Sequence, residues 1–131
     1  MKAFLAIKYY DNMQNKETIE NICSVLESAG IEAFAFARNV QNYGKCLLSP
    51  EQIMARACEE IKSSDIFIIE ASEVSIGIGI EAGIAFSAGI PIYLIYRKNS
   101  EVSNSIKGIS QKQLAYEKYE DISSLFPRAH I

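Results

Sequence analysis

Short apolar runs alternate with longer amphipathic segments along this chain, and this alternation limits its fold more than any other feature. The runs stand at residues 3–7, 31–37, 65–70 and 91–96, with a weaker one near 114–119. The first run, AFLAI, lacks polar alternation, as is typical of a strand covered on both faces of a parallel sheet. Parallel strands need crossover helices between them. We therefore expect one α/β domain over residues 1–131, flavodoxin- or Rossmann-like, with five mostly parallel strands and helices on both faces.

Two of the intervening segments show clear helix signals. Apolar residues recur at helical spacing from Ile19 and stop at Gly30, a natural C-cap. Ser49-Pro50-Glu51-Gln52 predicts an N-cap, a proline in the first turn and a capping box. This second helix should end near residue 63 and bury Ile53, Ala57 and Ile61. We expect a long loop over 38–48, a polar turn after residue 96 and a short closing helix at 121–126.

Charge and cysteine content exclude several kinds of partner. The 13 basic and 16 acidic residues are spread along the chain, with a net charge of -3, so we expect no nucleic-acid or membrane partner. No apolar segment reaches the roughly 18 to 20 residues that a membrane-spanning helix needs. Cys23, Cys46 and Cys58 are odd in number and lack metal-ligand spacing. These features predict a cytoplasmic protein without a metal site.

Ligands of open parallel sheets bind at the carboxyl ends of the strands. This rule directs attention to residues 8–12, 38–43, 70–75 and 97–103. The aromatic candidates for stacking on a ligand ring are Tyr9, Tyr10 and Tyr43. The basic candidates for neutralising an anion are Lys8, Arg38 and Arg97. For each of these residues the alternative is an ordinary structural role, as a half-buried aromatic or as a solvated or ion-paired base.

Residues 77–83, GIGIEAG, contain the most unusual carboxylate of the chain. They do not form a dinucleotide-binding fingerprint, because Ala82 stands where the third glycine would be required. Glu81 lies among apolar residues near the start of a predicted helix. It either complements the helix dipole, which stabilises a helix by about 0.3 to 1 kcal/mol, or serves as a poorly solvated carboxylate nucleophile.

The string from residue 65 to 108 resembles the nucleoside 2-deoxyribosyltransferase superfamily, and it is most similar to the 2'-deoxynucleoside 5'-phosphate N-hydrolase branch. The resemblance rests on a strand that ends in a glutamate, a serine- and glycine-rich turn with a second glutamate, and a later serine motif. The matching residues are Glu70, Ser75, Gly77, Gly79, Glu81, Gly83, Ala85, Gly89, Pro91, Arg97, Ser103, Ile106, Lys107 and Gly108.

The resemblance implies a reaction and a set of site residues. The glutamate that matches Glu81 attacks C1' of the sugar, displaces the base, and forms an ester that water or a second base resolves. Ser75 and Ser103 match serines that contact the 5'-phosphate, the second from a neighbouring subunit, although each could simply cap a helix. The resemblance thus implies a nucleoside 5'-monophosphate substrate, no cofactor, and a homodimer or larger homo-oligomer.

Two departures from the family pattern complicate this interpretation. The family has a glycine-rich loop with an arginine after the first strand, whereas this chain has KYYDN at 8–12. An aspartate of the second helix is replaced by Ala57. The carboxylates that could substitute for it are Glu70, Glu73, Asp11 and Glu60. The substrate-binding residues predicted in all are Lys8, Tyr9, Glu70, Ser75, Gly77, Gly79 and Ser103.

Three functional hypotheses remain open from the sequence. The leading one is hydrolysis of the N-glycosidic bond of a nucleoside 5'-monophosphate. A second keeps the chemistry at C1' but changes the substrate, to base exchange between nucleosides or to cleavage of the nicotinamide bond of NAD. The third is a non-catalytic module that senses a nucleotide, which the alanine at position 57 suggests.

Overall fold

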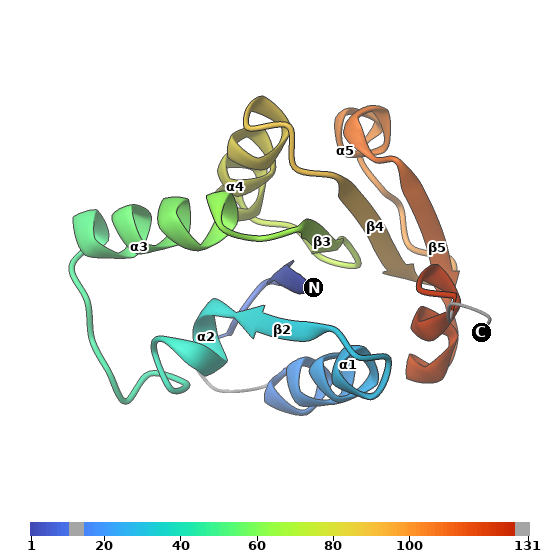
Figure 1. The fold of residues 1–131 in the computed structure, drawn as a ribbon, viewed down its shortest axis with the longest axis horizontal. Helices are drawn as coiled ribbons and strands as arrows, with labels where there is room; N and C mark the ends of the chain where they lie inside the picture. The colour runs from blue at the N-terminus through green and yellow to red at the C-terminus, as the bar shows by residue number, and fades with distance from the viewer. Residues whose placement is uncertain (11–14, 128–131) are drawn as a thin grey trace.

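A single five-stranded sheet forms the centre of the structure, a computed structural model that describes residues 1–10 and 15–127. Its strand order is β2-β1-β3-β4-β5, and every neighbouring pair is parallel (Figure 1). The strands are β1 (Lys2–Ala6), β2 (Glu32–Ala35), β3 (Ile66–Glu70), β4 (Ile92–Arg97) and β5 (Lys112–Tyr116). The predicted α/β class and parallel sheet are therefore confirmed.

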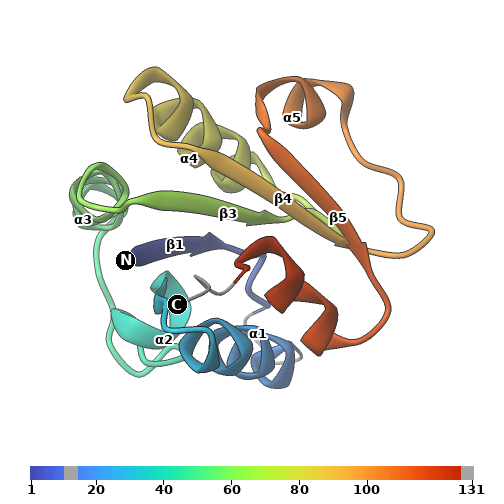
Figure 2. The ribbon, with the colours of Figure 1, turned by 45° about the vertical axis from the view of Figure 1, so that its right-hand side comes forward.

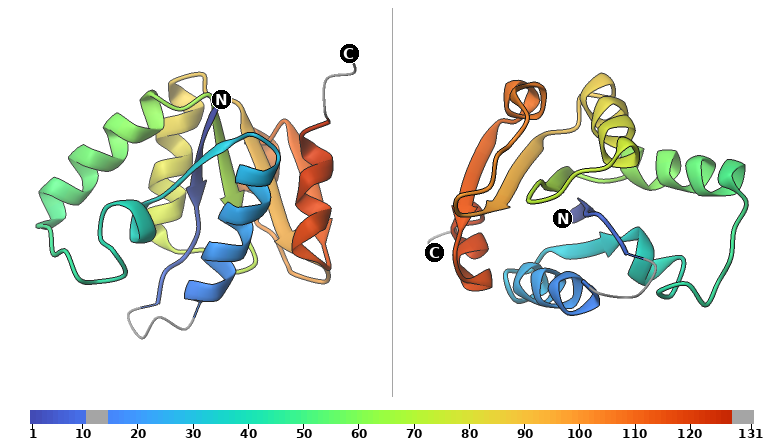
Figure 3. Two further views of the ribbon diagram at one scale, coloured as in Figure 1. Left: turned by 60° about the horizontal axis from the view of Figure 1, so that its bottom comes forward. Right: turned by 180° about the vertical axis from the view of Figure 1, so that it is seen from behind.

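Helices cover both faces of the sheet, as Figures 2 and 3 show. On one face lie α3, α4 and α5, and on the other α1 packs beside the 3-10 helix η1. The short α2 follows β2. The bounds are α1 (Lys16–Ser28), α2 (Phe36–Asn39), α3 (Pro50–Lys62), α4 (Ile76–Ser87), α5 (Asn104–Ile109) and η1 (Tyr119–Leu125). No helix of the described residues is long and apolar enough to span a membrane.

Successive strand residues point into two separate apolar cores. Phe4 lies in the core under α3, α4 and α5, where its ring stacks on that of Phe67 at 5.3 Å between centroids. Leu5 lies in the opposite core, against α1 and η1. Because both faces are buried, the strands read as continuous apolar runs without alternation.

The second predicted helix begins as its sequence indicates. In α3 the Ser49 hydroxyl accepts a hydrogen bond from the Gln52 amide at 3.1 Å, and the Gln52 side chain accepts one from the Ser49 amide at 2.9 Å. Gly30, which ends the turn after α1, has a φ of 82°, a left-handed conformation that glycine adopts without steric cost. Ala57 and Ile61 are buried and Ile53 is half-buried.

The connections differ from the prediction in three places. The strand expected to reach residue 37 ends at Ala35, because the Asn39 side chain accepts a hydrogen bond from the Ala35 amide and α2 begins there. The polar turn after β4 is followed by α5 before the last strand begins. The last strand begins at Lys112 and the closing helix at Tyr119, both two residues earlier than expected.

The strand order places a topological switch between β1 and β3. The chain leaves β1 toward β2 on one side and returns to β3 on the other. Loops after these two strands therefore diverge at their carboxyl ends and leave room for a ligand.

Candidate functional site

A pocket of about 430 Å³ lies at this switch, and we call it the strand-end pocket. Its walls come from the carboxyl ends of β1, β3 and β4 and from the start of α1. The lining residues are Ile7, Lys8, Tyr10, Asn15, Thr18, Glu70, Ser72, Glu73, Arg97 and Ser100. The position is the one that the parallel sheet predicts, and the pocket includes Lys8 and Glu70 of the predicted site.

Glu70 is the buried carboxylate of the strand-end pocket, with 5% of its surface exposed. One carboxylate oxygen, Oε1, accepts a 2.6 Å hydrogen bond from the Ser72 amide, and Oε2 accepts one of 3.2 Å from the Tyr116 hydroxyl. Tyr116 ends β5, two strands away. The carboxylate is thus held in one orientation by the loop after β3 and by a distant strand.

Arg97 is held beside this carboxylate by aromatic rings. Its guanidinium carbon lies 5.5 Å from the centre of the Tyr116 ring and 5.4 Å from that of Tyr119. One guanidinium nitrogen donates to the Tyr119 hydroxyl at 2.8 Å, and the Arg97 amide donates to the Ser72 hydroxyl at 2.8 Å. Tyr119 also contacts Thr18 of α1 through their hydroxyls, at 3.3 Å.

Glu81 lies on α4, on the side that turns toward the core. It is one helical turn from the buried Ile78 and Ala85, and it is only partly exposed. The Glu81 carboxylate makes no hydrogen bond or ion pair with another described residue. Burial without a polar partner raises the pKa of the Glu81 carboxyl to about 7. A carboxyl group with such a pKa exchanges its proton near neutral pH.

Ser75 and Ser103 line a second pocket, of about 330 Å³, which lies between α4 and α5. We call it the α4–α5 pocket. Ser75 caps α4 by accepting from the Ile78 amide at 3.4 Å, and Ser103 caps α5 by accepting from the Ser105 amide at 3.2 Å. The capping role of both serines is thus confirmed. The other lining residues are Val74, Gly79, Ala82, Gly83, Phe86, Ser105, Ile106 and Ile109.

The α4–α5 pocket and Glu81 lie on different sides of α4. Gly79, Gly83 and Phe86 follow each other at intervals of three or four residues and form one stripe of the helix facing the pocket. Glu81 is two residues from both glycines, which is roughly half a turn. The structure therefore joins Ser75, Gly79 and Ser103 in one pocket without Glu81. Gly77, in the first turn of α4, has an exposed backbone, and a Cβ there would lie 3.8 Å from the Ser75 hydroxyl.

Tyr9 does not line the strand-end pocket, contrary to expectation. Its ring packs against that of Tyr43, 6.0 Å away between centroids, and its hydroxyl is buried without a hydrogen-bond partner among the described residues. The neighbouring Tyr10 lines the pocket instead, with the Lys8 ammonium 4.9 Å from its ring centre. Arg38 also has a structural role, since it pairs with Glu27 at 3.0 Å on the surface of α1.

The structure places the carboxylates that could substitute for the family's aspartate at position 57 in different parts of the molecule. Ala57 is 1% exposed and faces the core. Glu60 lies at the opposite end of the strands, near the start of β1, where it pairs with Lys2 and Arg56. Glu70 and Glu73 both line the strand-end pocket, and Glu73 is 3.9 Å from the Lys8 ammonium. Asp11 lies outside the described residues.

Sequence reasoning missed Thr18, Tyr116 and Tyr119, which belong to the site through contacts between distant elements. It included Ser72 only as a member of the strand-end segment 70–75, without a role. Within the described residues, no three His, Cys, Asp or Glu side chains gather to hold a metal ion.

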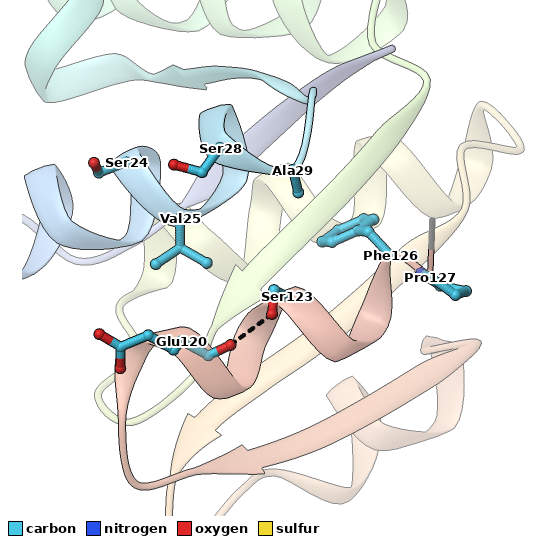
Figure 4. Close-up of a pocket in the computed structure, with 8 residues that line it drawn as sticks. All are labelled: Ser24, Val25, Ser28, Ala29, Glu120, Ser123, Phe126 and Pro127. Carbon is cyan, nitrogen blue, oxygen red and sulfur yellow. Dashed lines mark hydrogen bonds between the residues drawn. The ribbon is translucent and has the colours of Figure 1, made fainter. Parts of the chain in front are cut away.

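A further pocket of about 530 Å³ lies between α1 and η1, away from the strand ends (Figure 4). Val25 of α1 points toward η1, Ala29, just after α1, points toward Phe126, and the Ser123 hydroxyl donates to the backbone carbonyl of Glu120 at 2.7 Å. The pocket contains no residue of the predicted site and lies toward the end of α1, at the amino edge of the sheet.

Comparison with solved structures places this fold among enzymes that act at the glycosidic bond of nucleosides and nucleotides. A 2-deoxyribosyltransferase from Bacillus psychrosaccharolyticus superposes with a TM-score of 0.76, covering 94% of this chain and 90% of that one at 20% identity, which shows the shared fold. A CMP N-glycosidase from Clostridium botulinum superposes with a TM-score of 0.69, covering 95% and 97% at 26% identity.

A curated sequence relative defines the family more closely. A protein of Methanococcoides burtonii, whose assignment as a 2'-deoxynucleoside 5'-phosphate N-hydrolase is itself inferred, is 32% identical over 110 residues. The match covers 82% of this chain and 90% of that protein. No protein-family model matches the chain. The chain belongs to the 2'-deoxynucleoside 5'-phosphate N-hydrolase family, within the nucleoside 2-deoxyribosyltransferase superfamily, and is an enzyme of this kind.

Proposed function

We propose that this protein hydrolyses the N-glycosidic bond of a nucleoside 5'-monophosphate, with Glu81 as the nucleophile. A Glu81 carboxylate oxygen bonds to C1' as the C1'–N bond breaks, and the base leaves with a proton from solvent. Water then cleaves the glycosyl ester, which releases the sugar 5'-phosphate and restores the carboxylate. One domain over residues 1–131 would supply the fold for both steps, without a cofactor.

The observation that supports this proposal best is the environment of Glu81. Its carboxylate lies beside buried apolar residues of α4 and has no polar partner among the described residues. A carboxylate with little solvation is more nucleophilic than one that water or a cation stabilises, and a pKa near 7 leaves a large ionised fraction at neutral pH.

We place the phosphate at the first turn of α4. Ser75 caps this helix, and the exposed backbone of Gly77 lets an anion approach the free amides at the start of the turn, whereas the Gly79 amide already donates to the Ser75 carbonyl at 3.2 Å. Lys8 lies near the same loop, because its ammonium is 3.9 Å from Glu73. In the proposed arrangement Lys8, Ser75 and Gly77 bind the phosphate end of the substrate, Gly79 contributes only the space that its missing side chain leaves, and Tyr9 supports the loop rather than contacting the ligand.

A homodimer would bring a second Ser103 to the site, in addition to the Ser103 that shares the α4–α5 pocket with Ser75 of the same chain. Large apolar side chains are exposed on α4 and just before it: Val74, which precedes the helix, is 45% exposed, and in α4 Ile76 is 85%, Ile80 48% and Phe86 60% exposed. Such a patch on a small protein is typical of an interaction site. We propose that a second copy of the chain covers it and that Ser103 reaches the active site of that copy. The three free cysteines support a reducing, cytoplasmic location.

Base release from a panel of ribo- and deoxyribonucleoside 5'-monophosphates tests the proposed function. Wild type should release free base, and Glu81→Ala should release none above background. Glu59→Gln changes an exposed carboxylate of α3 and should leave the rate unchanged. Adding a free acceptor base separates hydrolysis from base exchange, which would yield a new nucleotide. Equal rates for wild type and Glu81→Ala would exclude this function for Glu81.

A further inference from the structure

The charged side chains of the strand-end pocket balance one another. Lys8 and Arg97 contribute two positive charges, and Glu70 and Glu73 contribute two negative ones. A phosphate dianion would meet both carboxylates there and gain no net attraction. An uncharged polar group with hydrogen-bond donors and acceptors suits such a pocket better.

The most deeply buried polar side chain of this pocket is Glu70, whose carboxylate only accepts hydrogen bonds. Each oxygen of Glu70 accepts one hydrogen bond within the protein, from the Ser72 amide and from the Tyr116 hydroxyl. A carboxylate oxygen can accept two hydrogen bonds, so each has capacity left for a ligand. The two existing bonds fix the carboxylate plane before any ligand arrives, which lowers the entropy cost of binding.

The walls around Glu70 suit a flat ring. Tyr10 and Arg97 both line the pocket, and Arg97 is held there by the Tyr116 and Tyr119 rings. A planar guanidinium and an aromatic ring are both surfaces on which a heterocycle stacks. The pocket volume of about 430 Å³ exceeds what one base needs.

From these observations we propose that the strand-end pocket is the nucleobase subsite and that Glu70 selects bases bearing an exocyclic amino group. This inference rests on the proposed function. An amino group facing Glu70 donates an N–H to the carboxylate. A carbonyl oxygen in the same place brings two acceptors together with no hydrogen between them. Cytosine and adenine are therefore favoured over uracil and hypoxanthine.

A comparison of four substrates tests this specificity. With wild type, kcat/KM for the cytosine and adenine monophosphates should exceed that for the uracil and hypoxanthine counterparts by about 10- to 100-fold, the size expected for a hydrogen bond to a charged group. Glu70→Gln presents an amide that can donate as well as accept, so the preference should shrink to within about threefold. Tyr116→Phe, which frees one carboxylate oxygen, should weaken the preference less. Glu59→Gln should retain it.

Binding of free bases to wild type makes the test independent of turnover and of any variant's stability. Calorimetry should show cytosine or adenine binding at least tenfold more tightly than uracil or hypoxanthine. Equal kcat/KM or equal binding for amino and carbonyl bases would overturn the role of Glu70 while leaving hydrolysis by Glu81 intact. Absence of base release from every nucleotide would contradict the proposed function. The relative binding of the four free bases would then still show whether the strand-end pocket selects bases with an amino group.

Discussion

The Tyr43 hydroxyl donates a 2.6 Å hydrogen bond to the Glu20 carboxylate, and this contact fastens the segment between α2 and α3 to α1. Tyr43 is buried. Its φ of 54° lies in the left-handed region, a conformation that costs a bulky residue about 1 to 2 kcal/mol. Its ring packs on Tyr9, in the loop that follows β1. The contact thus supports the loop that presents Lys8 and Tyr10 to the strand-end pocket.

Tyr43→Phe should lower the free energy of unfolding by about 1 kcal/mol, because the hydrogen bond is lost while Glu20 remains solvated. Tyr43→Ala should cost about 3 to 5 kcal/mol, since the buried ring is removed as well. Urea denaturation monitored by circular dichroism measures both. Equal losses of unfolding free energy in the two variants would show that the hydroxyl, rather than the packed ring, accounts for the contribution of Tyr43 to stability.

The pKa of Glu81 makes stability depend on pH. The group has an ordinary pKa of 4.5 when unfolded and about 7 when folded. Between these values the folded protein keeps a proton that the unfolded chain has released, so stability falls as pH rises from 4.5 to 7. The loss is on the order of 3 kcal/mol.

Glu81→Gln removes this titration, so the variant should gain stability relative to wild type as pH rises through the same range. Denaturation curves at several pH values from 4 to 8 measure the difference. Glu59→Gln serves as the control and should run parallel to wild type. A Glu81→Gln curve that also ran parallel would mean that the carboxyl group is not desolvated in the folded protein.

Ser49 and Ser75 both cap helices, but only Ser75 is proposed to bind substrate, so alanine variants of the two distinguish a structural role from a substrate-binding role. Ser49→Ala breaks a complete capping box of α3 and should cost about 1 kcal/mol. Ser75→Ala removes a longer, 3.4 Å cap contact and should cost less, yet it should raise KM for a nucleoside monophosphate several-fold. Thermal melts and steady-state kinetics on both variants check this. An unchanged KM in Ser75→Ala would limit Ser75 to capping.

The exposed apolar face of α4 predicts the effect of surface charges on assembly. Ile76→Lys or Phe86→Lys should give a monomer with reduced activity, because a buried lysine opposes association. Leu47→Lys is the matched control, since Leu47 is 87% exposed on a loop. Light scattering across a range of concentrations measures the mass. A wild-type monomer at assay concentration would rule out a shared active site.

The sequence predicted the sheet because each buried strand is a continuous apolar run, and it predicted α3 because the capping box is a local signal. The α2 helix was missed because its start depends on a single hydrogen bond that the Asn39 side chain accepts from the Ala35 amide. Glu70 and Lys8 were predicted from the ends of their strands. Tyr116 and Tyr119 could not be predicted, since their contacts with Glu70 and Arg97 join elements far apart in the chain. Tyr9 and Tyr10 are adjacent, and only packing decides which of them faces the pocket.

Detection of a sugar phosphate on Glu81 tests the central claim most directly. The enzyme is mixed with a nucleoside 5'-monophosphate that it turns over, quenched in acid within milliseconds, and mapped by peptide mass spectrometry. We predict an added mass of one sugar 5'-phosphate on the peptide containing Glu81, absent from the Glu81→Gln enzyme. Base release at full rate with no adduct on that peptide, or with the adduct on another residue, would contradict Glu81 as the nucleophile.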